Sequence, residues 1–169
     1  MSTLTLRVVA EQHPGPAPVS EHSLFAAVTA AQPVAGARAV PVPAHGGSAP
    51  RVSLGGEWRR LPLDADPPSV ASLPPEGDPA WQRVIVPDSF GREPALSAHF
   101  GPVYYQRRIV ALPSAHQRLV FDAVDYLCDV DLDGRHLGRH EGYFAPFAFD
   151  VTELARRGSL LTVRVQDPF

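Results

Sequence analysis

The stretch Cys128-Asp129-Val130-Asp131-Leu132-Asp133-Gly134 decides the fold class, because apolar and acidic side chains alternate strictly along it. Successive side chains of a β-strand point to opposite faces of the sheet, so this alternation predicts a strand with one apolar and one acidic face. Asp-Gly is a favoured pair in tight hairpin turns, so the strand should end there. We expect the acidic side chains to form a solvated face and Cys128 to be an unreactive core thiol.

The same period of two recurs over much of the chain from Arg51 onward. Further strands are expected at residues 81–86, 103–111, 118–124, 147–151 and 161–166, separated by turn signals rich in Pro, Ser, Asp and Gly. Many short strands with hairpin-type turns, and no β-α-β rhythm, predict an all-β sandwich of antiparallel strands. Trp58 and Trp81 lie in strand context and are expected in the core.

Residues 1–50 differ in composition from residues 51–169. They hold four of the 33 charged residues (15 basic and 18 acidic) and one of the 14 aromatic residues, Phe25. A segment with so few aromatic side chains cannot build much of a core. We therefore expect a Pro/Ala-rich, partly disordered N-terminal extension over residues 1–50, with a short strand at residues 3–9, and one packed domain over residues 51–169.

Charge and hydropathy exclude several classes of partner. The formal net charge of −3 argues against nucleic acid and anionic membranes, which need a basic surface. No apolar run approaches the roughly 20 residues of a membrane span.

The apolar segment 24–37 is preceded by Glu11 and Glu21, where a signal peptide is basic, so we predict a cytoplasmic protein. The single Cys128 excludes an internal disulfide and a multi-cysteine zinc site.

The spacing of Asp129, Asp131 and Asp133 before Gly134 is similar to the start of a calcium-binding EF-hand loop. Position twelve of such a loop should be a bidentate Glu, and here it is His140. The segment also alternates as a strand, which an EF-hand loop does not. We therefore expect no metal site and no other cofactor.

A series of short motifs follows a fixed order between residues 54 and 165. The motifs are LGGEW at 54–58, W-x-x-V-x-VP at 81–87, GPVYYQRR at 101–108, L-x-F-x-x-VD at 119–125, V-x-L-x-G-x-x-LG at 130–138, GYF-x-PF-x-FDVT at 142–152 and LTVRV at 161–165. Together they resemble the N-terminal sugar-binding domain of glycoside hydrolase family 2, which includes β-galactosidases, β-glucuronidases and β-mannosidases.

The resemblance implies a jelly-roll β-sandwich of the galactose-binding-domain-like type. In the family, an immunoglobulin-like domain and a (β/α)8 barrel follow this domain, and the barrel hydrolyses the O-glycosidic bond. The family's first domain returns for one more strand at a motif that is missing after Phe169, so the sandwich at residues 51–169 is expected to lack its last strand.

The implied role is accessory and not catalytic. Retaining glycosidases use two carboxylates about 5 Å apart, and the family's acid/base Glu follows an Asn. This chain contains no Asn, so we assign no catalytic residue to it. We expect it to bind carbohydrate and to shape the rim of an active site formed by the barrel, with the barrel and immunoglobulin-like domains as partners. Two alternatives stay open: a stand-alone carbohydrate-binding module, and an inactive fragment or protein-interaction module.

The resemblance assigns the first candidate binding residue. Asp125 matches a position where β-galactosidases of the family carry an Asn that reaches toward the substrate pocket. A carboxylate there can accept hydrogen bonds from two sugar hydroxyls. The alternative is that Asp125 bonds the backbone where its strand ends.

Residues 140–144 are the second candidate region and are expected to form a loop after the hairpin. His140 and Glu141 could bond sugar hydroxyls, and Tyr143 and Phe144 could stack on the apolar face of a pyranose ring. The alternative is that both aromatic rings cover the end of the sandwich or a neighbouring domain.

Overall fold

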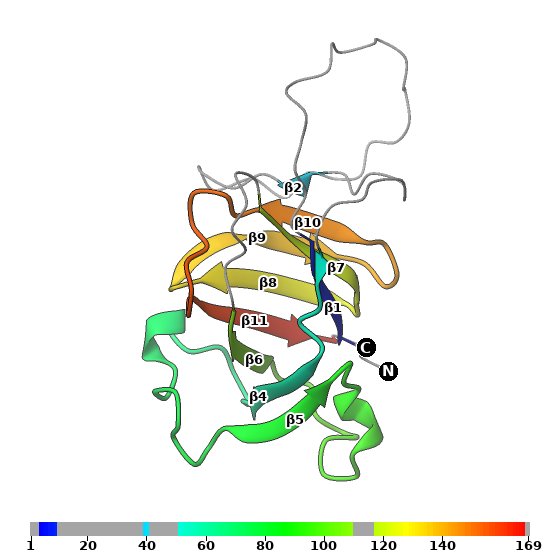
Figure 1. The fold of residues 1–169 in the computed structure, drawn as a ribbon. Helices are drawn as coiled ribbons and strands as arrows, with labels where there is room; N and C mark the ends of the chain where they lie inside the picture. The colour runs from blue at the N-terminus through cyan, green and yellow to red at the C-terminus, as the bar shows by residue number, and fades with distance from the viewer. Residues whose placement is uncertain (1–3, 10–38, 41–50, 110–116, 168–169) are drawn as a thin grey trace.

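The computed structural model describes residues 4–9, 39–40, 51–109 and 117–167, the first two ranges by their backbone only. The strands form two antiparallel sheets (Figure 1). The five-stranded sheet has the order β2-β10-β7-β1-β3 and consists of β1 (Leu4–Val9), β2 (Ala39–Val40), β3 (Arg51–Val52), β7 (Arg118–Val124) and β10 (Phe147–Asp150). The six-stranded sheet has the order β5-β4-β6-β11-β8-β9 and consists of β4 (Gly56–Pro62), β5 (Gln82–Val86), β6 (Val103–Arg108), β8 (Leu127–Leu132), β9 (Arg135–Glu141) and β11 (Leu160–Gln166).

Outside these strands, the regular structure of the described residues is two short 3-10 turns, η1 (Val70–Ser72) and η2 (Phe90–Arg92). The predicted all-β antiparallel jelly-roll sandwich is confirmed. Within the described ranges, no helix is long and apolar enough to cross a membrane.

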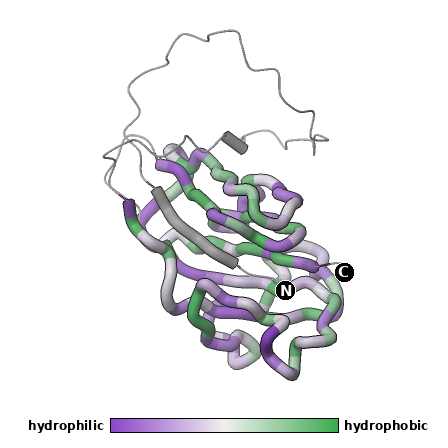
Figure 2. Tube along the Cα trace, turned by 90° about the vertical axis from the view of Figure 1, so that its right-hand side faces the viewer, coloured by the Kyte–Doolittle hydropathy of each residue, from purple (hydrophilic) through white to green (hydrophobic). Residues whose placement is uncertain are grey.

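The core lies between the two sheets and follows from the alternation in the sequence. Phe121 and Phe149 of the five-stranded sheet pack in one cluster with Trp58, Cys128 and Val130 of the six-stranded sheet, all of them buried. Figure 2 shows hydrophobic and hydrophilic residues alternating along the chain trace. Each such side chain contributes about 1.5–3 kcal/mol when it is fully buried, so this cluster is the main source of stability. The expected burial of Cys128 and Trp58 is confirmed.

The hairpin of β8 and β9 sets the register of the functional side chains. Its two-residue turn has positive φ at both Asp133 (50°) and Gly134 (79°), as the type I′ turn requires. The turn places Asp131 opposite His136, and an irregularity between Val130 and Asp131 then shifts the register by one residue. Because β9 continues as far as Glu141, the expected loop at residues 140–144 is wrong at its first two positions.

The segment between β4 and β5 covers part of the outer face of the six-stranded sheet. Leu73 and Trp81 of this segment pack on Leu61 and Tyr104 in a second buried cluster. Trp81 is therefore core, as expected. The prediction of a solvated acidic face is wrong for Asp129 and Asp131, which are only 8% and 5% exposed beside the covering segment, whereas Asp133 in the turn is exposed as expected.

Two strands from residues 1–50 take part in the five-stranded sheet. The predicted strand at residues 3–9 is confirmed as β1, which pairs with β7 on one side and β3 on the other. β2 pairs with β10 at the sheet edge. The rest of the expected extension lies outside the described residues, and the domain division at residue 50 and the expected lack of a last strand stay predictions.

Candidate functional site

One end of the sandwich gathers most of the predicted site residues. β7 ends at Val124, residues 125–126 lead into β8, and β9 ends where Glu141 pairs with Leu127. The backbone N–H of Gly142 donates to the carbonyl oxygen of Tyr126 (3.0 Å), so the two connections lie side by side. We call Asp125, Tyr126, Glu141, Tyr143 and Phe144 the end cluster.

Tyr126 organises the end cluster. Its hydroxyl donates to Glu141 Oε1 (2.5 Å), and its ring centroid lies 4.9 Å from that of Tyr143, at an interplanar angle of 49°. The hydrogen bond to Glu141 raises the pKa of Tyr126, because the carboxylate stabilises the neutral phenol. The side chain of Glu141 is thereby held in one orientation at the surface.

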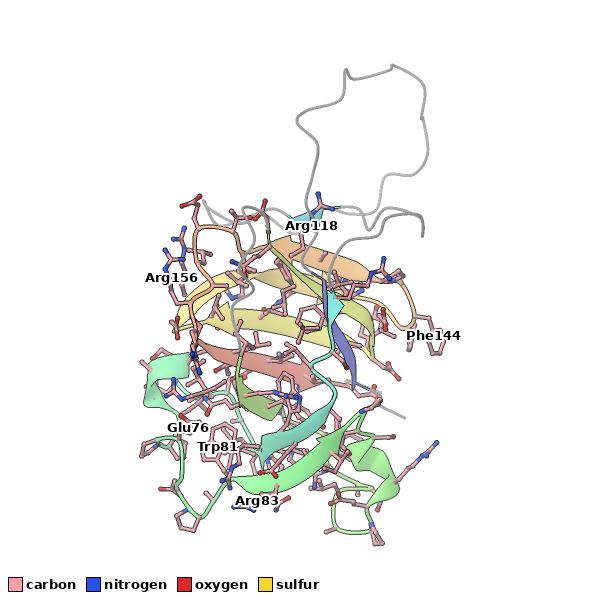
Figure 3. All side chains as sticks on the ribbon, in the orientation of Figure 1. Glu76, Trp81, Arg83, Arg118, Phe144 and Arg156 are labelled. Atoms are coloured by element: carbon pink, nitrogen blue, oxygen red, sulfur yellow. The ribbon has the colours of Figure 1, made fainter. Side chains whose placement is uncertain are left out.

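Two aromatic rings of the end cluster face solvent. Tyr143 is 47% exposed and Phe144 is 83% exposed, with 6.2 Å between their ring centroids. Figure 3 shows Phe144 on the loop between β9 and β10, at the periphery of the molecule. Exposed rings of this kind offer flat apolar surface, on which a sugar ring or another protein domain can pack.

Asp125 is the buried member of the end cluster, with only 8% of the residue exposed. Burial raises the pKa of the Asp125 carboxyl, and the negative charge of Asp167 adds to the rise. A carboxylate in this setting gains from hydrogen-bond donors, which sugar hydroxyls would supply.

His140 is separated from the other predicted residues. Its ring stacks on buried Phe147, with centroids 4.0 Å apart and an interplanar angle of 14°. Its Nε2 is buried and has no hydrogen-bond partner among the described residues. Burial lowers the pKa of His140, so the neutral ring is favoured. Because His140 belongs to β9 and faces Phe147, it lies on the core side of the strand, and Glu141 takes the exposed position.

The acidic side chains of β8 form a second polar site on the outer face of the six-stranded sheet. Arg139 donates two hydrogen bonds to Asp129 (2.8 and 3.0 Å), and Arg164 donates two to Asp66 (2.5 and 2.6 Å). Tyr104 also donates to Asp66 (2.7 Å). These residues line a cavity of about 230 Å³, which we call the outer-face cavity. Across the parts of the chain that the structure places, no three His, Cys, Asp or Glu side chains converge to hold a metal ion.

Sequence reasoning missed Tyr126 and the outer-face cavity. Tyr126 could have been found because it directly follows the candidate residue Asp125. Part of the cavity could also have been found, because a two-residue hairpin turn at Asp133-Gly134 places Asp131 opposite His136. The approach of Asp66 to Arg164 had no local signal, because 98 positions separate these two residues.

Comparison with known proteins agrees with the fold described above. Residues 100–169 match the family model of the glycosyl hydrolase 2 galactose-binding domain-like region. The resemblance to glycoside hydrolase family 2 is confirmed. This chain is 32% identical to rat β-glucuronidase over 119 residues, which is 64% of this chain and 16% of that relative. Mouse β-glucuronidase is 31% identical over the same length.

Solved structures of β-glucuronidases share the fold of this chain. The enzyme of Faecalibacterium prausnitzii superposes with a TM-score of 0.62 and 29% identity, over 74% of this chain and 22% of that chain. The enzyme of Bifidobacterium dentium, complexed with coumarin-3-O-glucuronide, has a TM-score of 0.55 and 30% identity over 80% of this chain and 21% of that chain. This chain therefore resembles the N-terminal domain of β-glucuronidases and spans about a sixth of the length of the curated relatives.

Proposed function

We propose that this chain is the sugar-binding accessory domain of a family 2 glycosidase of the β-glucuronidase type. Its end cluster would form part of the rim of an active site in a neighbouring barrel domain. The barrel would supply the two carboxylates that hydrolyse the O-glycosidic bond. The observation that carries the proposal is the gathering of Asp125, Glu141 and exposed Tyr143 at one end of a domain that resembles those of β-glucuronidases.

The chemistry of the end cluster suits a glycoside. Asp125 can accept hydrogen bonds from hydroxyls, and charged acceptors make the stronger kind of hydrogen bond. Tyr143 and Phe144 offer apolar rings to the sugar or to the group that it is linked to. Asp125 and Glu141 would repel the carboxylate of a glucuronide, so we expect them to face its hydroxyl groups.

Domain replacement tests the proposed role. In a chimera, this chain takes the place of the corresponding N-terminal domain of the Faecalibacterium prausnitzii enzyme, and hydrolysis of p-nitrophenyl β-D-glucuronide is measured. Asp125→Ala should raise KM about tenfold, because a hydrogen bond to a charged group contributes about 1.5–3 kcal/mol. The control is Glu153→Ala, which removes an exposed carboxylate beyond the far end of β10. Equal KM values for the two variants would contradict the rim role.

A titration of the chain alone separates the accessory role from a stand-alone carbohydrate-binding module. Amide-resolved NMR spectra are recorded with methyl β-D-glucuronide, galactose and mannose. Because a rim supplies only one wall of a site, we expect no saturable shifts at Asp125 or residues 140–144. Saturable shifts there would favour the stand-alone module.

A further inference from the structure

The outer-face cavity shares no residue with the end cluster. Its walls come from β6, β8, β9 and β11 and from the segment between β4 and β5, which contributes Asp66, Pro67, Ser69 and Val70. Its volume of about 230 Å³ lies below the 300–1,000 Å³ typical of pockets for drug-sized ligands. The cavity therefore has room for a small ligand of about one ring.

Paired charges hold the walls of the cavity in place. Arg164 is fixed by its two hydrogen bonds to Asp66, and Arg139 by its two hydrogen bonds to Asp129. Bidentate pairs of this kind fix the direction of the guanidinium plane as well as its position. The cavity thus presents a polar surface that is arranged before any ligand arrives.

Asp131 is the one carboxylate among the cavity's described residues that is not paired with an arginine. Its side chain is only 7% exposed, and its nearest counter-charge among the described residues is His136, whose Nδ1 lies 3.6 Å from Asp131 Oδ1. That distance is too long for a hydrogen bond. Burial raises the pKa of Asp131, and His136 offsets only part of that rise, so the carboxylate would gain from further hydrogen-bond donors. A ligand with hydroxyl donors would supply them.

The charges of the cavity decide which class of ligand fits. The cavity has more carboxylate groups (Asp66, Asp129 and Asp131) than guanidinium groups (Arg139 and Arg164). An anion is therefore repelled. The two guanidinium groups already neutralise Asp129 and Asp66, so only Asp131 remains to attract a free cation, and one carboxylate is a weak cation site. A neutral ligand that both donates and accepts hydrogen bonds meets neither penalty.

We propose that the outer-face cavity is a carbohydrate site that binds one neutral pyranose ring. Asp131 accepts hydrogen bonds from sugar hydroxyls, Arg139 and His136 donate to sugar oxygens, and Pro67 and Val70 lie against the apolar face of the ring. A ligand of this size gains little binding free energy in total, so we expect a dissociation constant on the order of 1 mM. The proposal does not depend on the accessory role of the end cluster.

The test is an amide-resolved NMR titration of the full chain with methyl β-D-glucopyranoside, methyl β-D-galactopyranoside, methyl β-D-glucuronide and methylammonium chloride. We expect saturable shifts at Asp131, His136 and Val70 with at least one neutral glycoside, and at least fivefold weaker binding of the glucuronide. Saturation by methylammonium, equal affinity for the glucuronide, or no saturable shift with either neutral glycoside overturns the proposal. Shifts at the end cluster are read separately, so the outcome for the proposed function stays distinguishable.

Two variants locate the binding. Asp131→Asn should weaken binding of the neutral glycoside at least fivefold, and exposed Ser69→Trp should block the cavity without altering the sheet. Asp133→Asn is the matched control, because it makes the same change in charge at the exposed hairpin turn, outside the cavity. Unchanged affinity in Ser69→Trp, which leaves the buried network intact, overturns the proposal even if Asp131→Asn fails to fold.

Discussion

Asp125 illustrates what sequence can predict about a single residue. The motif that ends in Val124-Asp125 predicted a polar side chain at a strand end, and the structure places it there with low exposure. The same reasoning placed His140 among solvent-facing residues. It failed because the bulge in the β8–β9 hairpin sets which side chains of β9 face Phe147. Gly138, at the register shift, is the local feature that could have indicated the bulge.

His140 should make the stability of the protein depend on pH. Its pKa is lowered by burial in the folded state, whereas the unfolded chain has the ordinary value of about 6.5. The unfolded state therefore binds more protons in this range, and stability that is fully present above pH 6.5 is lost as the pH falls toward the folded pKa. Thermal unfolding between pH 5 and 8 should show this loss, and His140→Phe, which can retain the stack on Phe147, should reduce it. An unchanged pH dependence in His140→Phe would contradict this assignment.

At the scale of elements, the strands were predictable because alternating apolar and polar residues indicate a strand with one buried face. The two-residue turn at Asp133-Gly134 also carries enough information to pair Asp131 with His136. The burial of the acidic face was not predictable from β8 itself. It depends on Leu73 and Trp81, which bring the segment between β4 and β5 over the sheet through contacts distant in sequence.

Gly138 in β9 should be intolerant of any side chain. A Cβ atom added there would lie 2.8 Å from Cε1 of the Phe149 ring, closer than real Cβ contacts allow. Gly138→Ala is expected to lower the free energy of unfolding by about 1–3 kcal/mol, the usual cost of overpacking a core. Urea unfolding measures this change. Gly91→Ala is the control, since nothing lies within 4 Å of its added Cβ, and a similar loss in both variants would contradict the close-packing argument.

At the scale of the whole molecule, Arg164 ties the covering segment to the sandwich. Its side chain is 11% exposed and bridges Asp66 of that segment to the sheet. Removing one partner of a buried pair costs about 3–5 kcal/mol, and solvent screening of Asp66, which is 48% exposed, reduces this cost. We expect Arg164→Met to lower the free energy of unfolding by about 2–3 kcal/mol in urea unfolding. The double variant with Asp66→Asn should recover part of the loss, and additive losses would contradict the bridge.

Different parts of the molecule have different roles. The core between the sheets supplies stability, the end cluster presents Asp125 and exposed rings, and the covered outer face forms a cavity. A crystal structure of the chimeric β-glucuronidase with a glucuronide-derived inhibitor tests the central claim most directly. The account predicts a carboxylate oxygen of Asp125 within about 2.6–3.2 Å of a sugar hydroxyl. A bound sugar that contacts neither Asp125 nor Tyr143 would contradict it.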